Sequence, residues 1–169
     1  GFGTNNIDHC TRLCHASSVN ALLEGIGSGA VSNPFTDVTE AEVIFVIGAN
    51  PIGNHPVAAT FMKNAVKSGK KLILVDPRRT ALSRHATYNL QFRPDTDVAL
   101  LNSLMHVIIE ENLCNEKYIT EHTTDFEKLK SNVADYSPEK VAPICGIPEE
   151  TLREVARTFA TAESAIILW

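Results

Sequence analysis

Apolar and polar positions along this chain fall in blocks that predict parallel strands separated by helices. Two continuous apolar runs, each closed by a polar turn, are typical of strands covered on both faces of a sheet. Between the strands, apolar residues recur with the helical period. Strands are predicted over 42–47, 71–75, 88–92 and 165–168, and helices over 17–26, 55–68, 80–85, 97–111 and 148–162.

Alternating strands and helices predict a doubly wound α/β fold: a mostly parallel sheet with helices on both faces, Rossmann-like and three-layered. We expect one domain over residues 1–169. The chain starts with Gly1 rather than Met, and its last residues, 165–169, resemble a strand that has only begun. We therefore expect the chain to be an internal piece of a longer polypeptide.

Two helices can be described in more detail. Residues 1–15 lack a helical period and are predicted to be a loop, after which Ser17 or Ser18 can cap a helix that glycines between 25 and 29 end. The apolar face of this helix is Val19, Leu22, Leu23 and Ile26. In the helix predicted over 97–111, the apolar side is Val98, Leu101, Leu104, Met105 and Ile108.

Polar loops follow three of the predicted strands, at the sheet edge where open α/β folds bind ligands. A glycine lets a ligand approach the backbone, and the start of the next helix favours an anion. An acid after the second strand suits a ribose hydroxyl, and its neighbouring arginine suits a phosphate. Two carboxylates in the third loop can accept hydrogen bonds from guanine. The candidate residues are Gly48, Asn50 and His55, then Asp76 and Arg78, then Asp95 and Asp97.

Each of these loops taken alone also fits a purely structural role, because such residues commonly end strands. The chain has no GxGxxG and no GxxxxGK[ST] motif, which disfavours a plain nicotinamide or ATP site. Three polar loops on one sheet edge together favour a ligand that carries a nucleotide.

Cys14 and His15 form the only pair that suggests reactive chemistry. A thiolate is a soft metal ligand, and an imidazole exchanges a proton near neutral pH. From the residues alone, a small buried thiol and a hydrogen-bonded loop histidine are the favoured interpretation, and the reactive pair is the alternative. The spacing of Cys10 and Cys14 does not match C-x-x-C-H haem attachment. We expect Cys10, Cys114 and Cys145 to be core thiols.

Composition and charge narrow the function classes. The formal net charge is −5, which disfavours a nucleic-acid surface. No apolar run approaches the roughly 20 residues of a membrane span, so we expect no membrane contact from this segment. Four cysteines in 169 residues do not make a disulfide scaffold, which favours a reducing compartment, and we expect the cytoplasm.

The segment NNIDHCTRLCHASSV, residues 5–19, resembles the active-site segment of the molybdopterin-dependent formate dehydrogenases, in their catalytic alpha subunit. The stretches 45–56, 75–78 and 95–112 resemble the same family, in the same order. The resemblance covers essentially the whole chain. Cysteine-ligated nitrate reductases have a similar segment but usually carry Met after the cysteine, so His15 favours formate.

This resemblance implies that Cys14 ligates molybdenum or tungsten, and that His15 assists proton removal or positions formate. The three loops would hold the guanine-dinucleotide arm of one of two molybdopterin cofactors. The parent protein would oxidise formate to carbon dioxide and pass two electrons to an iron–sulfur cluster in an N-terminal domain that this chain lacks. Its partners would be formate, the other domains, and electron-transfer subunits or acceptor proteins.

Three alternatives stay open at this point. The chain can belong to a formate dehydrogenase, to a nitrate reductase on the same cofactor, or to a non-catalytic nucleotide-binding module. On the first interpretation, half of the cofactor site lies outside the chain. We then expect residues 1–169 to be inactive by themselves, with no metal or pterin bound.

Overall fold

The computed structural model of the protein describes residues 1–31 and 33–169. Contacts divide the chain into two compact units, Gly1–Pro34 and Phe35–Trp169. A single functional domain over residues 1–169 stays a prediction.

The first unit carries two helices, α1 (Thr11–Cys14) and α2 (Ala16–Ile26). The loop predicted over residues 1–15 is therefore wrong at its end. The Cys14 N–H donates a hydrogen bond of 3.1 Å to the carbonyl of Cys10, which closes a helical turn there. The sequence has no apolar period at this point from which the turn could be predicted.

The helix predicted from residue 17 is confirmed as α2, and a glycine ends it as predicted, but its predicted N-cap is wrong. The N-cap is His15 rather than Ser17 or Ser18, and no side chain makes a capping hydrogen bond there. At the other end Gly27 takes a left-handed φ of 70°, a conformation that favours glycine.

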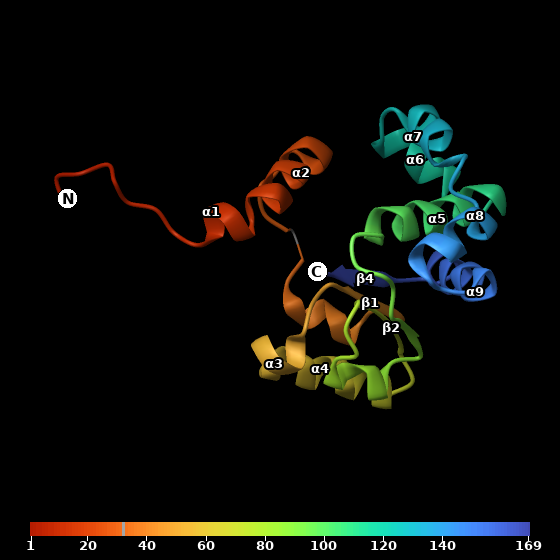
Figure 1. Cartoon of the computed structure of the whole chain (residues 1–169), viewed down its shortest axis with the longest axis horizontal. Coiled ribbons are helices and arrows are strands. Elements are labelled where there is room, and N and C mark those ends of the chain that lie inside the picture. The colour runs from red at the N-terminus through yellow and green to blue at the C-terminus, as the bar shows by residue number, and fades with distance from the viewer. Residues whose placement is uncertain (32) are drawn as a thin grey trace. The chain divides into compact units, whose positions relative to one another are not determined.

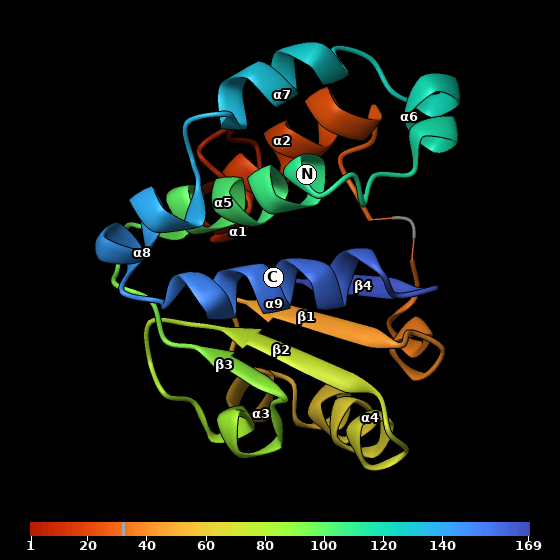
Figure 2. The ribbon, with the colours of Figure 1, turned by 90° about the vertical axis from the view of Figure 1, so that its right-hand side faces the viewer.

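The second unit is built on four parallel strands in the order β3-β2-β1-β4, with helices on both faces (Figures 1 and 2). The predicted doubly wound α/β fold is thus confirmed. β3 is shorter than predicted, because its pairing with β2 ends at Leu90. The strands are β1 (Val43–Ile47), β2 (Lys71–Val75), β3 (Tyr88–Leu90) and β4 (Ala165–Leu168).

One face of the sheet packs against η1 (Phe35–Thr39), which precedes β1, and against the elements that connect the first three strands. Ile44 and Val46 of β1 and Leu72 and Leu74 of β2 point to this side and are fully buried. Met62 of the longest helix here lies in the same cluster. The covering elements are η1 (Phe35–Thr39), α3 (Pro51–Asn54), α4 (Pro56–Lys67) and η2 (Ala81–His85).

The other face packs against helices from the C-terminal half. Val43 and Phe45 of β1 and Ile73 of β2 point this way. Because alternate residues of each strand serve opposite cores, the strand sequences are continuous apolar runs. The helices of this half are α5 (Asp97–Glu110), α6 (Glu116–His122), α7 (Phe126–Val133), α8 (Pro138–Cys145) and α9 (Glu149–Ala160).

The apolar side predicted for α5 is partly wrong. The buried residues of α5 are Leu100, Ser103, Leu104 and Val107, whereas Val98 is 63% exposed. α5 is apolar over a wide arc, so the pattern alone does not reveal which part meets the sheet. Leu101, Met105 and Ile108 instead line a cavity on that face.

Within residues 1–31 and 33–169, none of the helices is long and apolar enough to cross a membrane. The longest helices of the second unit, α5, α4 and α9, all pack on the sheet.

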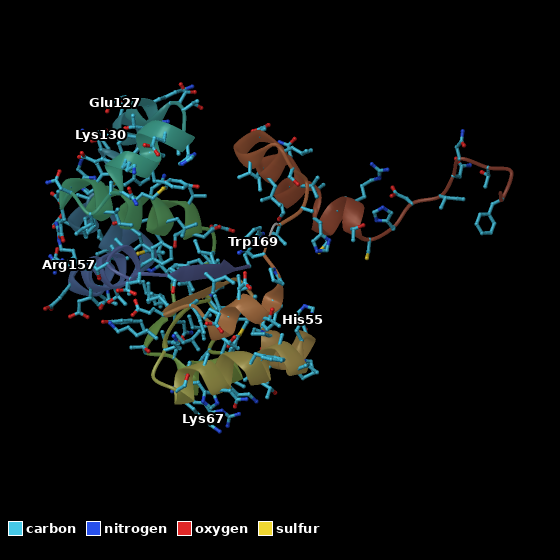
Figure 3. The ribbon with its side chains drawn as sticks, turned by 180° about the vertical axis from the view of Figure 1, so that it is seen from behind. His55, Lys67, Glu127, Lys130, Arg157 and Trp169 are labelled. Carbon is cyan, nitrogen blue, oxygen red and sulfur yellow. The ribbon has the colours of Figure 1, made fainter. Side chains whose placement is uncertain are left out.

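Two arginines on the outer side of α9 tie three helices together (Figure 3 labels Arg157). Arg153 donates to Glu110 of α5 at 2.9 Å and to Glu139 of α8 at 2.6 Å. Arg157 donates to both carboxylate oxygens of Glu111 at 2.7 and 2.8 Å. The hydrogen bond from Arg153 lowers the pKa of Glu139 from 4.5 to about 2.

This network predicts a pH-dependent contribution to stability. Because the pKa of Glu139 is lower in the folded protein, its contribution is complete above about pH 4.5 and disappears as the pH falls towards 2. The side chain is half exposed, so solvent limits the effect to less than about 1 kcal/mol. In urea unfolding, Glu139→Gln should have a lower free energy of unfolding than the unmodified protein at pH 6, and this difference should be smaller at pH 2.5.

Glu127→Gln on α7 is the matched control, because Glu127 is exposed (Figure 3) and no ion pair to it is found in the described part of the chain. It should change stability little at either pH. An equal deficit for both variants, or one that grows at low pH, would contradict the assigned role of Glu139.

Candidate functional site

Three loops leave the sheet at the same edge. Ile47 of β1 is in register with Val75 of β2, and Val75 is in register with Leu90 of β3. Because these strands are parallel and end at one level, the residues that follow them meet there. The register thus places the three loops at one edge, and Gly48 and Asp97 also line one cavity there.

Gly48 opens the first loop with a φ of 61°. Its N–H donates to the carbonyl of Val75 at 2.9 Å, which fixes the turn to the neighbouring strand. A Cβ placed at Gly48 would find no atom within 4 Å. The backbone here is therefore open to a ligand, and the left-handed φ explains the glycine.

Asn50 carries a buried side-chain oxygen, Oδ1, that has no hydrogen-bond partner among the described residues. Gly53 packs against this amide, since an added Cβ would lie 2.9 Å from Asn50 Nδ2. The role of Gly53 was not apparent from the sequence. His55 is exposed at the N-cap of α4, which no side chain caps (Figure 3).

The second loop is folded around Asp76. Its side chain is 2% exposed, accepts a hydrogen bond of 2.7 Å from the backbone N–H of Arg78, and lies 3.7 Å from the Arg78 guanidinium. Asp76 therefore shapes the loop rather than presenting a free carboxylate, whereas Arg78 is 76% exposed. Thr80, which the sequence analysis did not select, has a buried hydroxyl without a partner in the described chain.

The two aspartates of the third loop differ in their backbone. Asp95 has a left-handed φ of 64°, so it serves a turn as well as carrying a carboxylate. Asp97 is the first residue of α5 and is exposed. Thr96 between them donates its hydroxyl hydrogen bond to the carbonyl of Arg93 at 2.6 Å.

A cavity of about 600 Å³ extends from this edge along the face of β1 and β4. Gly48 and Asp97 lie on its wall, and apolar side chains of α5 and α9 form most of the remainder. Phe159 and Trp169 contribute aromatic surface to it. A flat aromatic base with polar edges suits such a cavity, because its faces meet apolar groups and its N–H groups meet a carboxylate.

Charge is divided unevenly between the two halves of the second unit. Residues 35–94 contain eight Lys and Arg and four acidic residues, Asp37, Glu40, Glu42 and Asp76. Residues 95–169 contain six Lys and Arg and fourteen Asp and Glu. The strands and loops that begin the candidate site are therefore electropositive, as an anionic ligand requires.

Cys14 and His15 belong to the first unit. Both are exposed; Cys14 ends α1, and His15 is the N-cap of α2. Within residues 1–31 and 33–169 no three His, Cys, Asp or Glu side chains gather as candidate metal ligands. Cys14 is thus exposed and is not part of such a group within these residues.

The three remaining cysteines differ from one another. Cys145 is fully buried, as expected for a core thiol. Cys114 is half-buried, and this burial raises the pKa of its thiol. Cys10 is exposed, so its prediction as a core thiol is wrong. Its place next to α1, which has no buried residue, explains the exposure.

A sequence profile described as Molybdopterin oxidoreductase matches residues 1–168 of this chain. The chain belongs to the molybdopterin oxidoreductase family. The alpha subunit of an F420-dependent formate dehydrogenase from Methanocaldococcus jannaschii is 41% identical, over 98% of this chain and 25% of that protein. The periplasmic nitrate reductase of Desulfovibrio desulfuricans is 38% identical, over 100% of this chain and 24% of the reductase.

Among solved structures, the acetylene hydratase of Pelobacter acetylenicus is similar with a TM-score of 0.82 and 31% identity. The match covers 94% of this chain and 22% of the hydratase. The chain spans about a quarter of the length of the curated relatives described above. Relatives named for formate, nitrate and acetylene all match, so membership of the molybdopterin oxidoreductase family does not by itself select a reaction.

Substitution of Asp76 and of Asp95 in this molybdopterin oxidoreductase chain should have different effects on the free energy of unfolding. Asp76→Ala leaves the Arg78 N–H without its buried acceptor, which should lower the free energy of unfolding by about 1–3 kcal/mol. Asp95→Gly places a glycine at a left-handed φ, and it should leave the free energy of unfolding unchanged or raise it by up to about 1 kcal/mol. Urea unfolding measures both free energies. If Asp76→Ala is as stable as the unmodified chain, the role of Asp76 in shaping its loop is wrong.

Proposed function

We propose that this chain is the part of a formate dehydrogenase catalytic subunit that holds the nucleotide arm of a molybdopterin guanine dinucleotide and presents Cys14 to the metal. The observation that supports the proposal is that three loops leave the sheet at one edge. There the backbone of Gly48 is accessible, Arg78 is exposed and Asp97 lies on the wall of an apolar cavity. Family membership names the cofactor class that this edge would bind.

The polar groups at the edge suit a nucleotide. Asn50 Oδ1 and the Thr80 hydroxyl are buried without partners in the described chain, a costly state that new hydrogen bonds would relieve. Arg78 and the uncapped start of α4 at His55 suit phosphates. Asp97, with Asp95 beside it, would accept the N–H groups of guanine. Asp76 would act indirectly, by fixing the Arg78 turn.

Cys14 suits a metal that the cofactor itself also ligates, since this thiol is exposed and not part of a larger set of protein ligands in the described residues. When bound, the molybdenum or tungsten cofactor supplies the two-electron oxidation of formate to carbon dioxide, with the electrons passing to an iron–sulfur cluster elsewhere in the longer protein. His15 is the group that would take the proton, at an imidazole nitrogen.

Nitrate reduction is the second candidate, because a nitrate reductase is 38% identical over the whole chain. His15 favours formate, because cysteine-ligated nitrate reductases usually carry Met after the cysteine. Assaying the longer protein with formate plus a dye acceptor, and with nitrate plus a reduced dye, separates the two reactions.

Replacement of Cys14 tests its role as metal ligand. In the longer protein, Cys14→Ser should lower formate turnover by more than the roughly 10- to 100-fold typical of losing a residue behind a ligand, while pterin content is retained. Cys10→Ser is the matched control, because Cys10 is equally exposed four residues away, and it should keep its turnover. Formate turnover retained by Cys14→Ser would exclude Cys14 as the ligand.

Nucleotide binding tests the three loops. GDP added to the 169-residue chain should shift the amide resonances of Gly48, Asn50, Arg78 and Asp97, with a dissociation constant of about 0.1–1 mM because much of the cofactor lies outside this site. A constant in the micromolar range or below would instead favour a stand-alone nucleotide-binding module. Shifts confined to other regions would refute the loop assignment.

A further inference from the structure

The third loop is attached to the rest of the fold at Arg93. The Arg93 N–H donates to the carbonyl of Cys145 at 2.9 Å, and its guanidinium Nη1 donates to the carbonyls of Pro143 at 2.6 Å and Ile144 at 3.4 Å. All three acceptors are the last residues of α8. A segment fifty positions away in sequence therefore holds this loop.

The end of α8 is well suited to an arginine. The last carbonyls of a helix lack partners within the helix and carry partial negative charge, and a guanidinium can serve two of them together. The C-cap of α8 is Gly146, whose φ is 79°. This left-handed φ favours the glycine, and Arg93 packs beside it, since a Cβ at Gly146 would lie in van der Waals contact with Arg93 at 3.4 Å from Nε.

Arg93 is connected to Asp97 by a short and well-defined turn. The Arg93 carbonyl accepts the Thr96 hydroxyl at 2.6 Å, and Asp95 makes the left-handed bend between them. α5 then begins at Asp97, on the wall of the cavity. The position of the Asp97 carboxylate relative to the cavity therefore depends on where Arg93 is held.

We propose that Arg93 is a positioning residue: by binding the end of α8 it places Asp97 to recognise guanine, and so sets base selectivity without touching the nucleotide. This inference rests on the proposed function of the three loops. It assigns the acceptor role for the base to Asp97, and it gives α8 a part in ligand selection.

The test compares GDP with inosine diphosphate, which lacks the 2-amino group of guanine. Both are titrated into the 169-residue chain and followed by amide resonances. The unmodified chain should prefer GDP by about tenfold, the value of one hydrogen bond to a charged group. Arg93→Gln should reduce this ratio to about one, and Arg93→Lys, which keeps one donor, should give an intermediate ratio.

Arg84→Gln is the matched control, because Arg84 is exposed on η2 and forms no ion pair within the described chain. It removes the same charge and should leave the GDP preference intact. Should Arg93→Gln fail to fold, Arg93→Lys carries the test, and an unchanged ratio there overturns the proposal.

The outcomes separate this inference from the proposed function. If Arg93 instead bound a phosphate, Arg93→Gln would weaken both nucleotides equally and preserve their ratio, which overturns the positioning role. If Asp97→Asn abolishes the preference while Arg93→Gln does not, the loop assignment stands and only Arg93 is excluded. If GDP shifts no loop resonance, the proposed function itself fails.

Discussion

The parallel register of β1, β2 and β3 is the constraint on which the rest of the structure depends. Ile47, Val75 and Leu90 lie level with one another, so every loop that follows a strand emerges at one edge. Burial on both faces enforces that register, because alternate residues of each strand serve two separate cores and a shift by one residue would exchange them. The placement of the three loops at one edge is thus a result of core packing, whereas contacts such as that between Asp76 and Arg78 shape the individual loops.

Features that depend on local pattern could be predicted from the sequence, and features that depend on distant partners could not. The apolar runs at 43–47 and 71–75 indicate their strands, since short apolar runs closed by polar turns are typical of strands covered on both faces. The orientation of α5 could not be predicted, because the helix is apolar over a wide arc and the sheet, α8 and α9 decide which part is covered. α1 is a single turn without a buried residue, and so it carries no pattern to detect.

The same distinction applies to the candidate site. Gly48 and Arg78 have the exposed positions that the motifs suggest, but the sequence could not reveal that the Asp76 carboxylate is buried within its own turn. It also gave no sign of Gly53 against Asn50, of the buried Thr80 hydroxyl, or of Arg93 at the end of α8. Each of these depends on a neighbour that only the folded chain supplies. Residue types at strand ends therefore predict where a site lies, whereas the role of each residue in it follows from its contacts in the folded chain.

The uneven charge of the second unit has a kinetic meaning. Eight cationic and four acidic residues over 35–94, beside an excess of acids over 95–169, give this unit a permanent dipole moment. A diffusing polyanion is rotated and drawn towards the cationic half before any contact forms, which raises the rate of productive encounter. Added salt screens this guidance over a distance of about 10 Å at 0.1 M, so encounter slows while the lifetime of the bound state changes little. Lys63 and Lys67 of α4 contribute to this cationic half.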